Sequence, residues 1–255
     1  MKIVLIGAGN VATHIGLRLK QTGAEILQVF SRSETSAKAL ADKLSVPFCI
    51  DVSCINPDAD IYIYSLTDSA LDEIISRIKI PKKVHIHTAG SIPMNIFENR
   101  TDNYGILYPL QTFSRTKTVD FQNIPLFLEA NNEFTSQLIL ELAQQLSNVH
   151  YFINSEKRRK IHLAAVFASN FTNYMYQLAD EIISEAQVPF DVLLPLIQET
   201  ADKVRFLSPK EAQTGPAVRK DEITIQNHLE LLKTNDNARN IYQTISGQIK
   251  ESHSS

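Results

Sequence analysis

The chain has 255 residues and a formal net charge of −3, a length that suits a nucleotide-binding domain followed by a smaller second domain. Because it contains no large basic block, we expect no nucleic-acid partner. No apolar stretch is long enough to span a bilayer, and the first apolar run is too short for a secretory signal, so a cytoplasmic protein without membrane contact is expected. The two cysteines, Cys49 and Cys54, lack a zinc-binding spacing and fit a reducing compartment.

Strand-length apolar runs alternate with helical patterns in the first 153 residues, as in a parallel α/β sheet. We predict strands at 2–6, 26–31, 48–50, 60–65, 83–87, 104–107, 125–129 and 149–153, and helices at 10–22, 34–44, 68–78 and 132–146. Beyond residue 154 we predict only helices, at 155–186, 189–206, 221–233 and 236–250, with a kink or break at Pro195. The predicted fold is α/β: a Rossmann doubly wound sheet in residues 1–153, then an all-helical substrate or dimerisation domain in residues 154–255.

A G-x-G-x-x-A fingerprint follows the first predicted strand and opens the first predicted helix, in the order that a dinucleotide-binding βαβ unit needs. Gly7 permits the tight turn out of the strand, Gly9 lets a pyrophosphate approach the backbone, and Ala12 lets the helix pack close to the sheet. The helix start, at Asn10 and Val11, offers free N–H groups and a positive dipole end to phosphates. These five residues are therefore candidate cofactor ligands.

The end of the second strand, Ser31-Arg32-Ser33, indicates which nucleotide binds. NAD sites usually carry an acid at this position, and none is present here. Arginine can stack on adenine and pair with a 2′-phosphate, to which the two serines can donate, so NADP(H) is favoured over NAD(H). The alternative is a solvated arginine at a strand end.

Three other segments follow predicted strands, and ligands of open α/β sheets bind beyond such strand ends. They are Ser65-Leu66-Thr67, the loop that begins at His87, and the segment 108–113; Ser65, Leu66, Thr67 and His87 are candidate cofactor contacts. His85 and His87 alternate on one strand, but no acid or cysteine is evident beside them, so no metal site is expected. We expect His87 to bond either the loop or the cofactor.

The long predicted helix carries the candidate catalytic residues. At helical spacing His162, Ser169, Asn173 and Gln177 share one stripe, with Asn170 beside it. This stripe faces either the nicotinamide or solvent, and spacing alone does not decide between them. In the later loop, Arg219 can bind an anionic group of a substrate, or Asp221 can cap the next helix; both remain open.

The fingerprint, the Ser31-Arg32-Ser33 strand end and the change to helices resemble the 6-phosphogluconate-dehydrogenase-like superfamily, which includes pyrroline-5-carboxylate reductase, ketopantoate reductase and deazaflavin-dependent NADP oxidoreductase. Segments 87–91, 108–113, 164–174 and 214–221 are similar to a bacterial subgroup of Rossmann-like oxidoreductases with a C-terminal helical domain of unknown function. The resemblance covers nearly the whole chain. It implies NADP(H) binding, hydride transfer and a homodimer formed through the helical domain.

Several members of this superfamily use Lys-x-x-x-Asn on the first long helix of the second domain. Asn170 or Asn173 can match the asparagine here, but Val166 and Ser169 stand where the lysine would be. His162 lies two turns before Asn170 and can act as proton donor instead, because imidazole titrates near neutral pH.

The leading hypothesis is therefore an NADP(H)-dependent oxidoreductase that transfers a hydride to or from a small-molecule C=O or C=N substrate, with His162, Asn170 or Asn173 acting on the heteroatom. A non-catalytic NADP(H)-binding sensor or partner protein is the alternative, since the lysine is missing. A third hypothesis is that the site binds another nucleotide or none.

Overall fold

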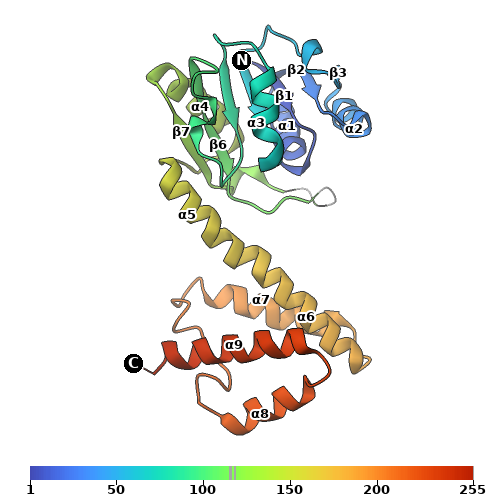
Figure 1. The fold of residues 1–255 in the computed structure, drawn as a ribbon, viewed down its shortest axis with the longest axis vertical. Helices are drawn as coiled ribbons and strands as arrows, with labels where there is room; N and C mark the ends of the chain where they lie inside the picture. Colours follow the sequence, from blue (N-terminus) through green and yellow to red (C-terminus); the bar gives the residue numbers. More distant parts are fainter. Residues whose placement is uncertain (115–116, 118, 255) are drawn as a thin grey trace. The chain divides into compact units, whose positions relative to one another are not determined.

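The computed structural model describes residues 1–114, 117 and 119–254, and it divides into two compact units, Met1–Asn170 and Phe171–Ser255 (Figure 1). Each unit has its own secondary-structure class. The first contains a sheet with helices, and the described part of the second contains helices without strands. The α/β fold with a helical C-terminal region is thus confirmed.

The first unit is built on one eight-stranded sheet with strand order β3-β2-β1-β4-β5-β6-β7-β8. The strands are β1 (Lys2–Ile6), β2 (Glu25–Phe30), β3 (Phe48–Cys49), β4 (Ile61–Tyr64), β5 (Val84–His87), β6 (Asn103–Pro109), β7 (Leu126–Ala130) and β8 (His150–Phe152). All neighbours pair in parallel except β6 and β7, which are antiparallel. The order reverses direction at β1, next to β4, and such a switch point is where open α/β sheets bind ligands.

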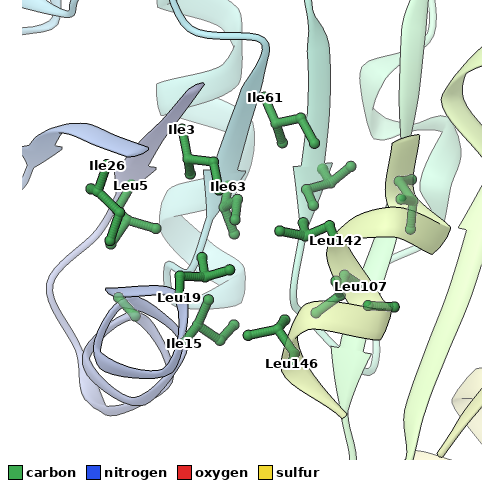
Figure 2. Close-up of a cluster of buried hydrophobic side chains, with 14 of the residues drawn as sticks. Ile3, Leu5, Ile15, Leu19, Ile26, Ile61, Ile63, Leu107, Leu142 and Leu146 are labelled. Atoms are coloured by element: carbon green, nitrogen blue, oxygen red, sulfur yellow. The ribbon is translucent and has the colours of Figure 1, made fainter. Parts of the chain in front are cut away.

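Apolar side chains on both faces hold the sheet between two helical layers. Because alternate residues of a strand point to opposite faces, Ile3 and Leu5 of β1 join one buried cluster while Val4 and Ile6 join the other. Figure 2 shows the first cluster, in which Ile3 and Leu5 lie near Ile15, Leu19, Leu142 and Leu146. Burial on both faces explains why Ile3–Ile6 of β1 and all of β4 are continuous apolar runs rather than alternating ones.

The helices described in the first unit are α1 (Asn10–Gln21), α2 (Glu34–Leu44), α3 (Asp68–Arg77), α4 (Glu133–Leu146) and α5 (Ser155–Ala165). They begin in two ways: three follow a residue whose side chain accepts from a free backbone N–H group, and two, α1 and α3, do not. Ser33 caps α2, Asn132 caps α4 and Asn154 caps α5 through side-chain oxygens. Gly9, which precedes α1, has no side chain to offer, so the first-turn N–H groups of α1 remain available for a ligand.

The predicted helix over 155–186 is wrong in one respect. A π-helical stretch, Val166–Phe171, separates α5 from α6 (Thr172–Glu185). A π-helix bonds i to i+5 rather than i+4, so the side-chain stripe drawn at α-helical spacing is not continuous. The stripe from His162 to Gln177 is therefore broken at this stretch.

The second unit contains α6, α7 (Leu194–Lys203), α8 (Glu222–Leu231) and α9 (Asp236–Ser252). The break expected near Pro195 is present: a 3-10 helix, Phe190–Leu193, ends there and α7 begins with the proline in its first turn, where no N–H is needed. His228 of α8 contacts the hydroxyl of Tyr242 of α9 at 2.8 Å. Within the described residues no helix is long and apolar enough to cross a membrane.

The boundary between functional domains, expected at residues 153 and 154, stays a prediction. The compact units meet seventeen residues later, at Asn170 and Phe171, because α5 packs with the first unit. The last strand nevertheless ends at Phe152 and α5 begins at Ser155, so the change from strands to helices falls where the sequence indicates it.

Candidate functional site

A pocket of about 470 Å³ opens where β1, β2 and β4 end. Backbone hydrogen bonds continue past each strand, from Gly7 N to Phe30 O at 2.7 Å and from Ser65 N to Ile6 O at 2.8 Å, and they bring the three strand ends together. Gly7 has φ +115°, and a Cβ there would collide with the carbonyl oxygen of Ser65. Only glycine fits this turn. The pocket is lined by Gly7, Ala8, Gly9, Phe30, Ser31, Arg32, Ser33, Ser36, Ser65, Leu66, Thr67, Ala70 and Ile74.

The N-terminus of α1 lies at the edge of this pocket. A Cβ added at Gly9 would have no other atom within 4 Å, so the space in front of the helix is open to a ligand. The Asn10 side chain is engaged elsewhere: its Nδ2 donates to the carbonyl of Phe113 at 2.8 Å. His14 contacts the carbonyl of Ser114 at 2.8 Å and packs against the Phe113 ring. Helix α1 therefore offers backbone N–H groups to the pocket and uses side chains to hold the 110–114 segment.

Arg32 lies in the pocket but is not free. Its Nη1 donates to Oε2 of Glu73, on α3, at 3.0 Å, and both side chains are about half exposed, at 56% and 51%. The other carboxylate oxygen of Glu73 lies 3.6 Å from Arg77. Arg32 is thus a cation held at the strand end by a carboxylate that solvent can reach.

A second pocket, of about 480 Å³, lies on the other side of the α1 N-terminus, with all its lining in the first unit. Its lining residues are Asn10, Val11, Tyr108, Leu110, Gln111, Thr112, Phe113, His162, Ala165, Val166, Ala168, Ser169 and Asn170. His162 and Asn170, both expected to be catalytic, are therefore brought together. Asn173 belongs to the second unit, at the start of α6.

His162 forms a pair with Tyr108, at the end of β6. The Tyr108 hydroxyl lies 2.9 Å from Nδ1 of His162, and the two rings meet edge to face. Burial raises the pKa of Tyr108, although the nearby guanidinium of Arg158 opposes the shift. The phenol therefore keeps its proton at neutral pH, and its hydroxyl donates to Nδ1 or accepts from it according to the tautomer of His162.

The turn at residues 89–92 packs against the His162 ring. A Cβ on Gly90 would lie 2.5 Å from Nδ1 and 2.6 Å from Cγ of His162, so the backbone of the turn is in close contact with the imidazole. Only a residue without a side chain allows this approach. The position of the ring is thus set by Tyr108 on one side and by Gly90 on another.

Arg158 holds that turn in place. Its side chain is fully buried, and its guanidinium donates to the carbonyls of Ala89, Gly90 and Ile92 at 2.8–2.9 Å and to the hydroxyl of Ser155 at 3.1 Å. Its charge is balanced by Glu129 at 3.6 Å. Burial lowers the pKa of Arg158, and the carboxylate opposes this shift. A buried arginine satisfied mainly by backbone carbonyls is a rigid clamp.

The two strand histidines lie inside the fold rather than on the pocket surface. His85 bonds the Tyr64 hydroxyl and the Ile80 carbonyl, both at 2.8 Å, and burial lowers its pKa to about 4. His87 is fully buried, accepts a bond from Ala89 N at 3.2 Å, and has its pKa lowered by burial to about 3. Of the two roles expected for His87, the structure contains the loop contact; the cofactor contact stays a prediction.

Other expectations have direct structural counterparts. Asp221 caps α8 by accepting bonds from the N–H and hydroxyl of Thr224, which lowers its pKa, so of the two roles left open for this loop the cap is present. Anion binding by Arg219 stays a prediction. Among the described residues no group of three or more metal-ligating side chains occurs.

Comparisons with known proteins indicate the class to which the chain belongs. Residues 2–89 match the family described as NADP oxidoreductase, coenzyme F420-dependent, and residues 124–249 match the domain of unknown function DUF2520. No curated protein matches the chain. A Bacteroides fragilis protein described as a putative NADP oxidoreductase is 47% identical, with a TM-score of 0.94 over 98% of both chains.

Two more distant structures share the fold. A reductive aminase from Aspergillus terreus, in complex with NADPH and ethyl-5-oxohexanoate, is 11% identical, with a TM-score of 0.74 over 98% of this chain and 93% of that one. A 1-pyrroline-5-carboxylate reductase from Streptococcus pyogenes is 16% identical, with a TM-score of 0.65 over 99% and 98%.

The fingerprint pocket at the switch point of a parallel sheet, followed by a helical region, defines a Rossmann-type oxidoreductase that uses a nicotinamide cofactor. The 47% identity over almost the whole length then decides the family. The chain belongs to the family of the Bacteroides fragilis protein, in which an NADP-oxidoreductase domain precedes a DUF2520 domain.

Proposed function

We propose that this protein is an NADP(H)-dependent oxidoreductase that transfers a hydride to or from a small C=O or C=N substrate. The observation that carries the proposal is the pair of pockets on either side of the α1 N-terminus. Gly9 lines the first pocket, with Arg32 at its far end, and Asn10 and Val11 line the second, with His162 inside it. An elongated dinucleotide would find binding groups for its parts in these two pockets.

The first pocket fits the adenosine and phosphate end of NADP(H). Arg32, flanked by Ser31 and Ser33, would hold the 2′-phosphate, and the uncapped N–H groups at Asn10 and Val11 would hold the pyrophosphate. The small and polar strand end 65–67 would lie along the ribose on the nicotinamide side. NADP(H) rather than NAD(H) follows from a cation, and not an acid, at the end of β2.

A bound nicotinamide would supply or accept the hydride at the substrate carbon. The residues of the second pocket would act on the heteroatom. His162 would donate in its protonated form: Nε2 would give its proton to the oxygen or nitrogen as hydride reaches the carbon, and the neutral imidazole left behind would keep its Nδ1–H bonded to the Tyr108 hydroxyl oxygen. Asn170 lines the same pocket and would hold the heteroatom through its amide. Asn173 stays a candidate for the same task.

The proposal is tested by the oxidation of NADPH in the presence of ketone, imine and deazaflavin panels, with His162→Ala beside wild type. We expect turnover with at least one panel, a loss of about 100-fold or more in the variant, and unchanged NADPH affinity. His253→Ala removes an imidazole from the C-terminal end of α9 and should retain full turnover. NADPH binding without turnover in any panel would favour the non-catalytic sensor or partner protein instead.

A homodimer formed through the helical region is the remaining part of the proposal. Several large apolar side chains of the second unit are exposed, among them Leu196, Phe206, Ile223 and Leu231. Such surfaces usually mark protein contacts. Sedimentation equilibrium of the full chain should give twice the monomer mass of 28.7 kDa, and a monomer at micromolar concentration would contradict this part.

A further inference from the structure

The ion pair between Arg32 and Glu73 lies at the place proposed for the 2′-phosphate, so it bears on nucleotide choice. Helix α3 lines the pocket through Ala70 and Ile74, and Glu73 lies on the same helix. Its carboxylate contacts Arg32 at 3.0 Å and Arg77 at 3.6 Å. The guanidinium that would recognise the phosphate is therefore paired with a carboxylate.

A 2′-phosphate must therefore compete with a carboxylate for Arg32. An exposed pair of this kind is weak, so displacing it lowers the affinity for the phosphate by up to about fivefold. The carboxylate would also lie close to the phosphate, and like charges repel. Both effects reduce the affinity for NADPH. Neither acts on NADH, which carries a hydroxyl group in place of the phosphate.

Resting on the function proposed above, we propose that Glu73 is a specificity-determining residue that limits the preference for NADPH over NADH by competing with the 2′-phosphate for Arg32. In the free protein Glu73 also keeps the guanidinium at the strand end. The preference of the site for NADPH is thus a balance between Arg32 and Glu73 rather than a property of the arginine alone.

Calorimetric titration of Glu73→Gln with NADPH and NADH tests this proposal. We expect NADPH to bind about threefold or more tightly than to wild type, NADH affinity to be unchanged, and the gain to shrink at high salt. Asp72→Asn is the matched control, since it removes the same charge from the neighbouring residue of α3, whose partner is Arg100 at 2.8 Å. It should change neither affinity.

Two results would overturn the proposal: NADPH affinity that is unchanged or weaker in Glu73→Gln, or an equal gain in Asp72→Asn. The first would mean that the carboxylate does not compete with the phosphate, and the second that only net charge matters. Arg32→Ala separates this test from the proposed function. If wild-type NADPH affinity does not depend on Arg32, the phosphate site itself is wrong, whatever Glu73→Gln does.

Discussion

Replacing Gly90 with alanine should displace the His162 ring. The added Cβ would lie 2.5 Å from Nδ1, whereas ordinary contacts begin near 3.4 Å, so the ring or the turn must move by about 1 Å. The turn cannot yield easily, because Arg158 holds three of its carbonyls. If the ring moves, its 2.9 Å contact with Tyr108 lengthens to about 3.9 Å, beyond hydrogen-bond reach.

The size of the effect follows from these distances. Overpacking of a buried contact costs about 1–3 kcal/mol of the free energy of unfolding. A displacement of about 1 Å at a reacting group can lower turnover about 100-fold. NADPH affinity should stay at the wild-type value, since Gly90 does not line the first pocket. Urea unfolding measures the loss of stability. ¹⁵N NMR of the imidazole detects the loss of the Nδ1 hydrogen bond, and NADPH oxidation measures the loss of turnover.

Gly247→Ala is the matched control. A Cβ there would meet nothing within 4 Å, and the residue lies inside α9, so this change should stabilise the protein by about 0.5–1 kcal/mol. If Gly90→Ala shows wild-type stability and an unchanged imidazole spectrum, the close approach of the turn to His162 is wrong. Gly90 would then have no part in fixing the position of the His162 ring.

Three further outcomes are expected. Arg158→Met should cost about 3–5 kcal/mol in urea unfolding because it leaves the largely buried Glu129 carboxylate without its cation and three carbonyls without their donor, and a cost below about 1 kcal/mol would show that the clamp is not structural. Burial lowers the pKa of His85 to about 4 and that of His87 to about 3, below the unfolded value near 6.5, so the unfolded chain binds more protons as pH falls; stability should drop by about 2 kcal/mol per pH unit between about pH 6 and 4.5, and a flat profile would refute this. Tyr108→Phe should lower turnover about tenfold or more and change the tautomer ratio of His162 seen by ¹⁵N NMR, with NADPH affinity retained; wild-type turnover would remove Tyr108 from the mechanism.

The sheet and the first pocket could be predicted because their signals are local. A fingerprint such as Gly7-x-Gly9 specifies a turn, a close approach and a helix start within a few residues. Buried parallel strands are short apolar runs, which are easy to locate in sequence. The antiparallel pairing of β6 with β7 had no such signal, because no feature of either strand alone sets its direction.

The contacts that complete the site join residues far apart in the sequence, and the sequence alone does not predict them. Arg158 lies in the charged run Lys157 to Lys160, which is typical of a solvated helix face, yet its side chain is fully buried. Glu73 is one of several acids on α3, and only the fold brings it to Arg32. Tyr108 belongs to a segment that the sequence marks as a candidate, but its pairing with His162 spans 54 residues.

The placement of the helical residues was predicted only in part. His162 and Asn170 line one pocket, and their catalytic roles stay predictions. The prediction assumed an unbroken α-helix, whereas a π-helical stretch, Val166–Phe171, interrupts it. No pattern of residue types identifies such a stretch, since it forms when packing favours one extra residue per turn. The cytoplasmic location stays a prediction.

Calorimetric titration of the wild-type protein and Arg32→Ala with NADPH and NADH tests the central claim most directly. A charge-assisted hydrogen bond contributes about 1.5–3 kcal/mol, so NADPH should bind more tightly than NADH, and the variant should lose about tenfold or more of its NADPH affinity with NADH affinity spared. Binding of neither nucleotide, or an NADPH affinity that does not depend on Arg32, would contradict the NADP(H) site and the function built on it.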